Sequence, residues 1–360
     1  MKIDDSFAKG LPTLPIARRR RAFTLAQISD LSDFSRHFAP AIQRSLIGSS
    51  RPTGISDTTK RVLESGIKVV EKIRQNGPEV PLSNEEAAAY ESVVLIYDRP
   101  ALLVQNDKCA AAAKPWDVLL TAADAAISAR LPKAGRIEIA IGDSVREVAS
   151  GFVVGDGLIM TNRHVVEVIA VADRSDPTKW QVRSNLRPQI NFKGEYLVND
   201  TSRVFLLDTE SPALTHPKYD LGLLRIRKES TSTPASAAPP PLKLAGTASD
   251  LKSNQNIYVV GYPAADNQNR IPKAVLDDIF GGIFEVKRLA PGTVAANWED
   301  QGVFAHDCST LGGNSGSFVM DFETELVTGL HFQGSYLKAN YAIWLWPLKD
   351  YLVEHGVQFD

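Results

Sequence analysis

The feature that most constrains the fold is a run of short apolar segments separated by Gly, Pro, Asn and Asp, from about residue 136 onward. Ile137, Ile139 and Ile141 alternate with polar or small residues, as in a half-buried strand. Similar segments occur at residues 151–154, 158–160, 204–207, 221–226, 257–260, 303–305, 317–320, 326–331 and 341–345. Many short strands with frequent turn signals favour a β sandwich or barrel. The sequence therefore predicts a mainly β domain over residues 135–360.

The region before this domain has a different pattern. Apolar residues recur at helical spacing in residues 24–46, 56–75 and 116–131, and Ser83 with Glu86 forms a capping box before a further helix over residues 87–97. Residues 1–22 contain two prolines and a run of four arginines, which is typical of a solvated tail. We therefore expect a disordered tail at residues 1–22 and a mainly α-helical regulatory or interaction domain at residues 23–134.

Composition limits the partners and the compartment. The net charge of −2 gives no electrostatic footprint for nucleic acid, and no apolar run reaches the roughly 18–20 residues of a membrane-spanning helix. The basic run near the N-terminus is not followed by the apolar region of a signal peptide. With only Cys109 and Cys308, a disulfide framework is not expected, although free thiols and a single pair both remain open. These features predict a cytoplasmic protein with no membrane or nucleic-acid partner.

Residues 312–317 read Gly-Gly-Asn-Ser-Gly-Ser, which places Ser315 on a glycine-rich turn. Glycine allows a sharp turn and a close approach of backbone N–H groups to a bound carbonyl, so the serine can stand exposed as a nucleophile. Taken alone, the same residues also fit an ordinary surface loop. The choice between these interpretations depends on the rest of the chain.

Two further segments supply the partners that a nucleophilic serine needs. His164 follows two apolar segments joined by a Gly-Asp-Gly turn, and Asp220 stands directly before the apolar segment at residues 221–226. The order His–Asp–Ser is that of chymotrypsin-like enzymes, in which the spacings are about 45 and about 93 residues; here they are 56 and 95. The rival groups are Asp200, Asp208 and His216, none of which has the same local setting.

These segments resemble the trypsin-like serine peptidases of bacteria, which have the chymotrypsin fold. The resemblance extends over about residues 135–360 and includes Ile257-Tyr-Val-Val-Gly-Tyr-Pro and His306-Asp-Cys-Ser-Thr-Leu-Gly-Gly-Asn-Ser. It implies a double β-barrel, a protein substrate and no metal or organic cofactor. It also implies a catalytic triad of His164, Asp220 and Ser315, with an oxyanion hole formed by the N–H groups of Gly313 and Ser315.

The resemblance also suggests a specificity pocket. Ser309 stands where trypsin itself has an aspartate, so cleavage after Lys or Arg is not expected. The segment Gly329-Leu-His-Phe-Gln-Gly334 resembles that of glutamyl endopeptidases, in which the histidine faces a Glu or Gln side chain at P1. By resemblance, the substrate-binding residues are Ser309, Thr310, His331, Gln333 and Gly334. The alternative for His331 is a buried structural histidine. His306 is expected to be structural, and Cys308 is expected to pack in the pocket wall and not to act as a nucleophile.

The function predicted from the sequence is that of a bacterial serine endopeptidase in the cytoplasm. Because cytoplasmic proteolysis must be restrained, we expect the helical region to bind an activator or a specific partner, as a conditional effector in antiphage defence or stress would. The alternative from another class is a binding or scaffold protein that has a protease fold without relevant catalysis.

Overall fold

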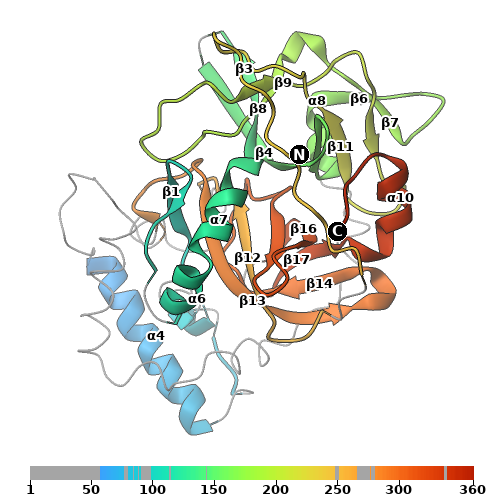
Figure 1. Cartoon of the computed structure of the whole chain (residues 1–360). Coiled ribbons are helices and arrows are strands. Elements are labelled where there is room, and N and C mark those ends of the chain that lie inside the picture. The colour runs from blue at the N-terminus through green and yellow to red at the C-terminus, as the bar shows by residue number, and fades with distance from the viewer. Residues whose placement is uncertain are drawn as a thin grey trace.

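The computed structural model describes residues 57–76, 80–83, 85–87, 89–90, 99–112, 115–142, 144–247, 251–265, 276, 280–335 and 339–360. The predicted tail at residues 1–22 and the predicted helix at residues 24–46 lie outside these residues. The described chain is mainly β, with two antiparallel sheets that lie one above the other (Figure 1). The mainly β class predicted for residues 135–360 is confirmed.

The first sheet has the strand order β6-β7-β10-β11-β5-β4-β3-β8-β9. Its strands are β3 (Ala134–Ile141), β4 (Ser144–Gly155), β5 (Leu158–Thr161), β6 (Ala170–Ala172), β7 (Lys179–Val182), β8 (Pro188–Asn191), β9 (Val204–Leu206), β10 (Ala213–Thr215) and β11 (Gly222–Arg225). Just beyond β9, Leu207 forms an antiparallel bridge with Ile226, and the N–H of Asp208 donates to Arg225. These contacts join β9 to β11, so the six strands β11-β5-β4-β3-β8-β9 close into a ring.

The second sheet contains a closed barrel of six strands. They are β12 (Asn256–Gly261), β13 (Arg288–Trp298), β14 (Val303–His306), β15 (Phe318–Asp321), β16 (Val327–Ser335) and β17 (Ala339–Trp344), and β12 pairs with both β13 and β15. Strands β1 (Leu102–Gln105) and β2 (Lys108–Cys109) extend this sheet, because β1 pairs with β13. A segment from the region predicted to be helical therefore adds a strand to the C-terminal sheet.

The helices within the described residues are short, apart from α4. They are α4 (Asp57–Asn76), α6 (Asp117–Ala122), α7 (Asp124–Arg130), α8 (Arg163–Ile169) and α10 (Lys349–Glu354), with 3₁₀ turns η2 (Leu131–Lys133), η3 (Ser184–Leu186), η4 (Glu299–Gln301) and η5 (Trp346–Leu348). The predicted helix at residues 116–131 is thus two helices and a 3₁₀ turn. The Ser83–Glu86 capping box is confirmed by reciprocal bonds of 2.8 and 3.1 Å. No described helix has both the length and the apolar character needed to cross a membrane.

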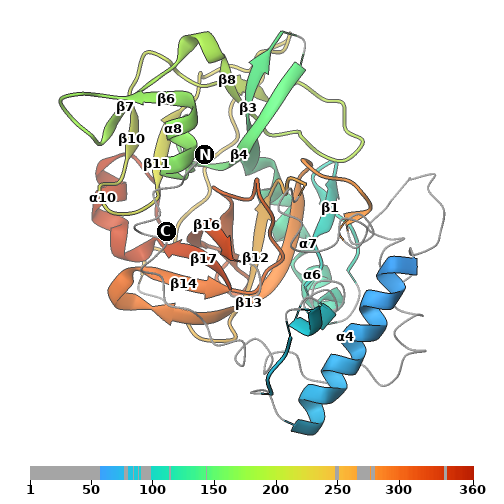
Figure 2. The ribbon, with the colours of Figure 1, turned by 180° about the vertical axis from the view of Figure 1, so that it is seen from behind.

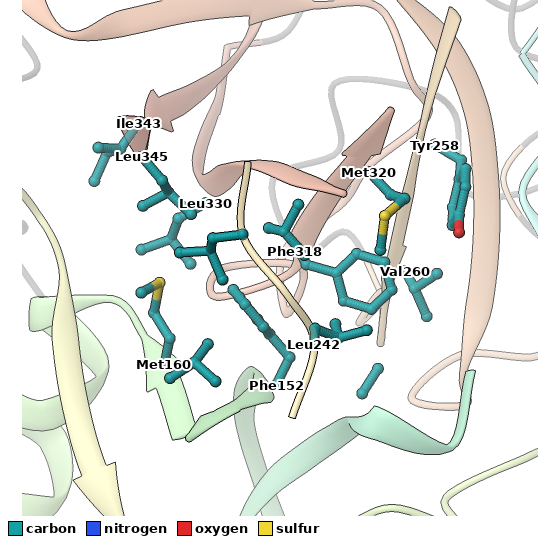
Figure 3. Packing of buried hydrophobic residues seen from close by; sticks show 14 of the residues in the cluster. Phe152, Met160, Leu242, Tyr258, Val260, Phe318, Met320, Leu330, Ile343 and Leu345 are labelled. Atoms are coloured by element: carbon teal, nitrogen blue, oxygen red, sulfur yellow. The ribbon is translucent and has the colours of Figure 1, made fainter. Parts of the chain in front are cut away.

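The main core lies between the two sheets. Phe152 and Met160 from the first sheet meet Phe318 and Leu330 from the second, and the rings of Phe152 and Phe318 are 5.7 Å apart, edge to face (Figure 3). Each buried aromatic or aliphatic side chain of this kind contributes about 1.5–3 kcal/mol. The contact between the sheets brings the ends of their strands together, and the candidate site is built from those ends.

The residues just before the β domain also pack into this core. Leu102, Trp116 and Leu131 are buried in the same apolar cluster as Phe152 and Phe318. Helix α4 lies outside it, along one side of the molecule (Figure 2), and buries Val69, Val70 and Ile73. The predicted division into domains at residues 22 and 134 stays a prediction, and residues 102–131 are held tightly to the second sheet.

Candidate active site

His164 and Asp220 are brought together by two neighbouring strands. His164 follows the end of β5, Asp220 precedes β11, and these antiparallel strands pair Gly222 with Thr161. The end of one strand therefore lies beside the start of the other. Gly222 is needed for the close packing of β11 on α8, because a Cβ at this position would lie 2.6 Å from the Val166 side chain. The register of the first sheet thus determines how the two side chains meet.

Asp220 holds His164 at two points. Nδ1 of the His164 ring lies 2.7 Å from Oδ2 of Asp220, and the backbone N–H of His164 donates to Oδ1 at 3.0 Å. The Asn162 side chain donates to the Asp220 carbonyl at 2.8 Å, which fixes the backbone on the other side. An imidazole that donates its Nδ1 proton to a carboxylate keeps a lone pair on Nε2. A histidine ring held in this way can accept a proton at Nε2.

Ser315 lies on a turn clamped between the two sheets. Its carbonyl accepts from the N–H of Ser150 at 2.9 Å, and the next N–H, that of Gly316, donates to the His331 carbonyl at 3.0 Å. Gly313 and Gly316 both have φ of +87°, a conformation that glycine adopts without strain. A side chain at Gly316 would also lie 2.1 Å from the Ser150 carbonyl. The turn therefore needs glycine at both positions, and Ser315 itself stays half-exposed.

The peptides around Ser315 have their carbonyls turned into the protein. The Gly312 carbonyl accepts from Ala264 N–H, the Gly313 carbonyl from Ser150 Oγ at 2.8 Å, and the Asn314 carbonyl from Ser317 N–H at 2.9 Å. In a trans peptide the N–H points opposite to the carbonyl. The N–H groups of Gly313 and Ser315 therefore face the other way, and neither donates to an acceptor within the described part of the chain.

Ser150 is a residue to which the sequence analysis assigned no role. It is 1% exposed, and its hydroxyl accepts from the Tyr262 N–H at 3.1 Å while donating to the Gly313 carbonyl. It therefore connects Tyr262, the residue just after β12, to the serine turn. Its position directly before Gly151 in a strand carries no periodic signal that could distinguish it from any other buried serine.

His331, which the sequence predicts as a substrate-binding residue, is a buried residue of β16. It is 2% exposed, and its Nδ1 is 3.0 Å from Nε2 of His306, which is also buried. Burial holds the pKa of His331 well below its usual value, and the nearby His306 and His164 lower it further. His331 is therefore neutral at physiological pH. His306, which the sequence predicts to be a structural residue, is in direct contact with His331.

The other predicted pocket residues occupy different positions in the wall. Thr310 is half-buried and lies near the exposed Gly334. Its Oγ1 is 3.6 Å from the position that a Cβ added to Gly334 would take. The Asn340 side chain also lies beside Gly334, and its amide N–H donates to the Cys308 carbonyl at 2.7 Å. Ser309 is buried, and its hydroxyl donates to the backbone carbonyl of Arg99. The Ser309 hydroxyl is thus used within the wall.

Gln333 and Gly334 lie on β16 past the point where its pairing with β15 ends. The last bonds on that side are those of His331 with Gly316 and Ser317. On its other side β16 continues to pair with β17, with Gln333 opposite Tyr341. The described structure therefore places both residues on a strand paired with β17 and no longer with β15, where an extended peptide could be added.

The rival residues have structural roles. Asp200 and Asp208 accept backbone N–H groups two residues further on, at 2.8 and 2.9 Å. Nδ1 of His216 accepts from the N–H groups of Lys218 and Tyr219, both at 3.1 Å, and burial with nearby cations lowers its pKa to about 4. A histidine engaged in this way is a turn acceptor rather than a general base.

The two cysteines are free thiols rather than a pair. Burial raises the pKa of Cys308 well above its usual value, so it stays a thiol beside the serine turn. Within the part of the chain that the structure describes, no three His, Cys, Asp or Glu side chains gather as metal ligands.

Comparison with known proteins supports this chemistry. The profile of the trypsin-like peptidase domain matches residues 149–330. A protein of Lysobacter enzymogenes named "Probable serine protease" is 30% identical, over 78% of this chain and 79% of its own length. Glutamyl endopeptidase and exfoliative toxin A of Staphylococcus aureus are each 25% identical, over 55% and 51% of this chain and 46% and 55% of their own lengths. The chain thus spans about half of each staphylococcal relative. It belongs to the trypsin-like peptidase family and is a serine endopeptidase.

Proposed function

We propose that the chain cleaves peptide bonds with Ser315 as nucleophile, His164 as general base and acid, and Asp220 as the group that orients the imidazole. The bond between His164 Nδ1 and Asp220 carries this proposal, because it leaves Nε2 as the proton acceptor. In the first step Nε2 takes the Ser315 hydroxyl proton while Oγ attacks the scissile carbonyl. In the second step the same nitrogen returns the proton to the leaving amine, and water then hydrolyses the acyl-enzyme.

We assign the oxyanion hole to the N–H groups of Gly313 and Ser315. Three neighbouring carbonyls are already bonded elsewhere, so these donors need not reorient when negative charge develops on the substrate oxygen. Such preorganised donors are each worth about 10²–10³ in kcat. Ser150 contributes indirectly, since its hydroxyl keeps the Gly313 carbonyl turned away from the substrate.

We further propose that the pocket prefers Glu or Gln at P1. The Nδ1 atom of His331 is engaged by His306, and when His306 Nε2 carries the shared proton, His331 must carry its own proton on Nε2. A neutral imidazole can then donate to the side-chain oxygen of either residue. In the described segment 307–309, the Asp307 carboxylate is paired with Arg99 and the Ser309 hydroxyl is bonded to the Arg99 carbonyl, so neither is offered to a basic P1 side chain.

A cleavage profile of a peptide library tests the pocket. We expect wild type to favour P1 Glu or Gln, and His331→Leu to lose about 10- to 100-fold in kcat/KM for these peptides, because a hydrogen bond to a charged group is worth about 1.5–3 kcal/mol. The matched control is His355→Leu at the end of α10, where the ring bonds only to the Tyr351 carbonyl in the described structure. Strong wild-type cleavage after Lys or Arg, or an unchanged preference in His331→Leu, contradicts the proposal.

We propose in addition that the N-terminal region restrains the protease until a partner binds. Val62 of α4 packs against a cluster of Ala101, Leu276 and Phe280, and Leu311 packs against the same cluster. Leu311 directly precedes the glycines of the serine turn. A shift of α4 would therefore reach the substrate side of the site through one layer of side chains. The activator, the cytoplasmic location and the role in defence stay predictions.

Replacing Val62 by aspartate should release this restraint. A charge in the shared cluster is unfavourable, so α4 should detach, and basal hydrolysis of a P1-Gln peptide should rise by about 5- to 150-fold, the usual range of coupling between sites. Val118→Asp is the matched control, because Val118 is a helical valine that is already 75% exposed. If wild type degrades casein freely without an activator, or if Val62→Asp is no more active than wild type, the restraint is refuted.

A further inference from the structure

The wall of the proposed P1 pocket is the segment from Asp307 to Ser309, which leads into the serine turn. Asp307 forms an ion pair with Arg99, a residue far away in the chain. Asp307 is only 12% exposed, and its carboxylate lies 2.6 Å from Nη2 of Arg99, which is 5% exposed. The same carboxylate accepts from the N–H and hydroxyl of Thr293 at 2.6 and 2.9 Å. Burial alone raises the pKa of Asp307, but Arg99 and the Thr293 donors bring it below its usual value. The pair is therefore charged at neutral pH.

Arg99 holds this wall at a second point. Its backbone carbonyl accepts the hydroxyl of Ser309, two residues beyond Asp307. One residue thus bonds to both ends of the segment from Asp307 to Ser309. Its guanidinium also lies over the ring of Trp116, 5.5 Å from the centroid. The ion pair of the guanidinium with Asp307 and its stacking on Trp116 hold the Arg99 side chain, and the bond from Ser309 holds the Arg99 backbone.

The Arg99 segment is itself anchored to the second sheet. Arg288, 2% exposed, donates to the Ala101 carbonyl, and β1 pairs with β13 directly after it. Strand β13 passes the wall at close range, because a Cβ on Gly292 would be 2.7 Å from both Asp307 Oδ1 and the Cys308 sulfur. The wall is therefore held both by its packing against β13 and by its bonds to Arg99.

We infer that Arg99 is a positioning residue for the P1 pocket: from outside the catalytic strands, it fixes residues 307–309 so that Thr310 and the serine turn face the substrate. This inference rests on the proposed P1 pocket. Without the guanidinium, Asp307 is a buried carboxylate without its cation, which is strongly unfavourable. The carboxylate should turn toward water and move Cys308 and Ser309 with it, which changes the pocket and leaves the bond between His164 and Asp220 in place.

The test measures kcat/KM of the full chain for two peptides that differ only at P1, with Gln or Ala. In wild type the Gln/Ala ratio is above one. In Arg99→Ala we expect this ratio to fall at least tenfold, mainly through a higher KM for the Gln peptide, while a fluorophosphonate probe still labels Ser315. Arg99→Lys should recover part of the ratio, because lysine restores the charge with a single point of contact. Methylguanidinium at about 50 mM should also raise the ratio in Arg99→Ala and leave wild type unchanged.

Arg130→Ala is the matched control. Arg130 also ties the region before the β domain to the second sheet, through a 2.7 Å bond to Glu325, but it does not touch residues 307–310 in the described structure. Its Gln/Ala ratio should equal that of wild type. An Arg99→Ala enzyme that keeps the wild-type ratio, or that loses both peptides in equal proportion, overturns the inference. If Arg99→Ala does not fold, the same criteria apply to Arg99→Lys and Asp307→Asn. A wild-type ratio of one, or hydrolysis that survives in Ser315→Ala, refutes the proposed function instead.

Discussion

Replacing Ser315 with alanine lowers kcat for peptide hydrolysis by on the order of 10⁶-fold, the effect known from removal of the nucleophile in a serine protease of another fold. Ser315 is half-exposed on the turn between Gly313 and Gly316, and its hydroxyl is the proposed nucleophile. Cys308 is not expected to replace it, because Cys308 is a buried thiol whose pKa is raised. The measurement is single-turnover hydrolysis of a P1-Gln peptide together with labelling by a fluorophosphonate probe.

Ser175→Ala is the control for this experiment. Ser175 is an exposed turn serine whose hydroxyl bonds to Asp173, and its removal should leave both hydrolysis and labelling unchanged. The fold of Ser315→Ala should also be retained, since the turn is held by backbone bonds. If wild type is no more active than Ser315→Ala, catalysis is not the function, and the alternative of a binding protein with a protease fold stands.

Replacing Asp220 with asparagine lowers kcat by about 10⁴-fold, as the equivalent change does in trypsin. In this chain the reason can be read from two contacts. One oxygen of Asp220 accepts the backbone N–H of His164, so the amide oxygen of asparagine must take that place. The amide NH₂ then faces Nδ1, and the ring proton is forced onto Nε2. His164 in that tautomer cannot accept the proton of Ser315.

Asp208→Asn provides the comparison, because Asp208 also accepts a backbone N–H but belongs to a turn away from His164. Its kcat should stay within about threefold of wild type, as is usual for a surface substitution. Ring-nitrogen chemical shifts of His164 should report the change of tautomer in Asp220→Asn. A loss of less than tenfold, or a loss of the same size in Asp208→Asn, shows that Asp220 does not orient the base.

The sequence was informative wherever the signal is local. The turn at residues 312–317 needs positive φ at Gly313 and Gly316, and only glycine adopts this conformation without strain, so the motif is visible in the residues themselves. The apolar strand after Asp220 and the segment before His164 are local patterns of the same kind. Their order along the chain suggested that they meet, and the pairing of β5 with β11 places Nδ1 of His164 2.7 Å from Oδ2 of Asp220.

Only the tertiary structure could decide the contacts between residues distant in the chain. Arg99 and Asp307 are 208 positions apart, and Ser150 and Gly313 are 163 apart. The sequence around each of these residues is typical of an ordinary loop or strand. A periodic pattern indicates which side of an element is buried, but it does not identify the residue that packs against it. The contact of His306 with His331 was missed for the same reason. The local sequence thus determined the serine turn, while the packing of the two sheets decided which side chains hold it.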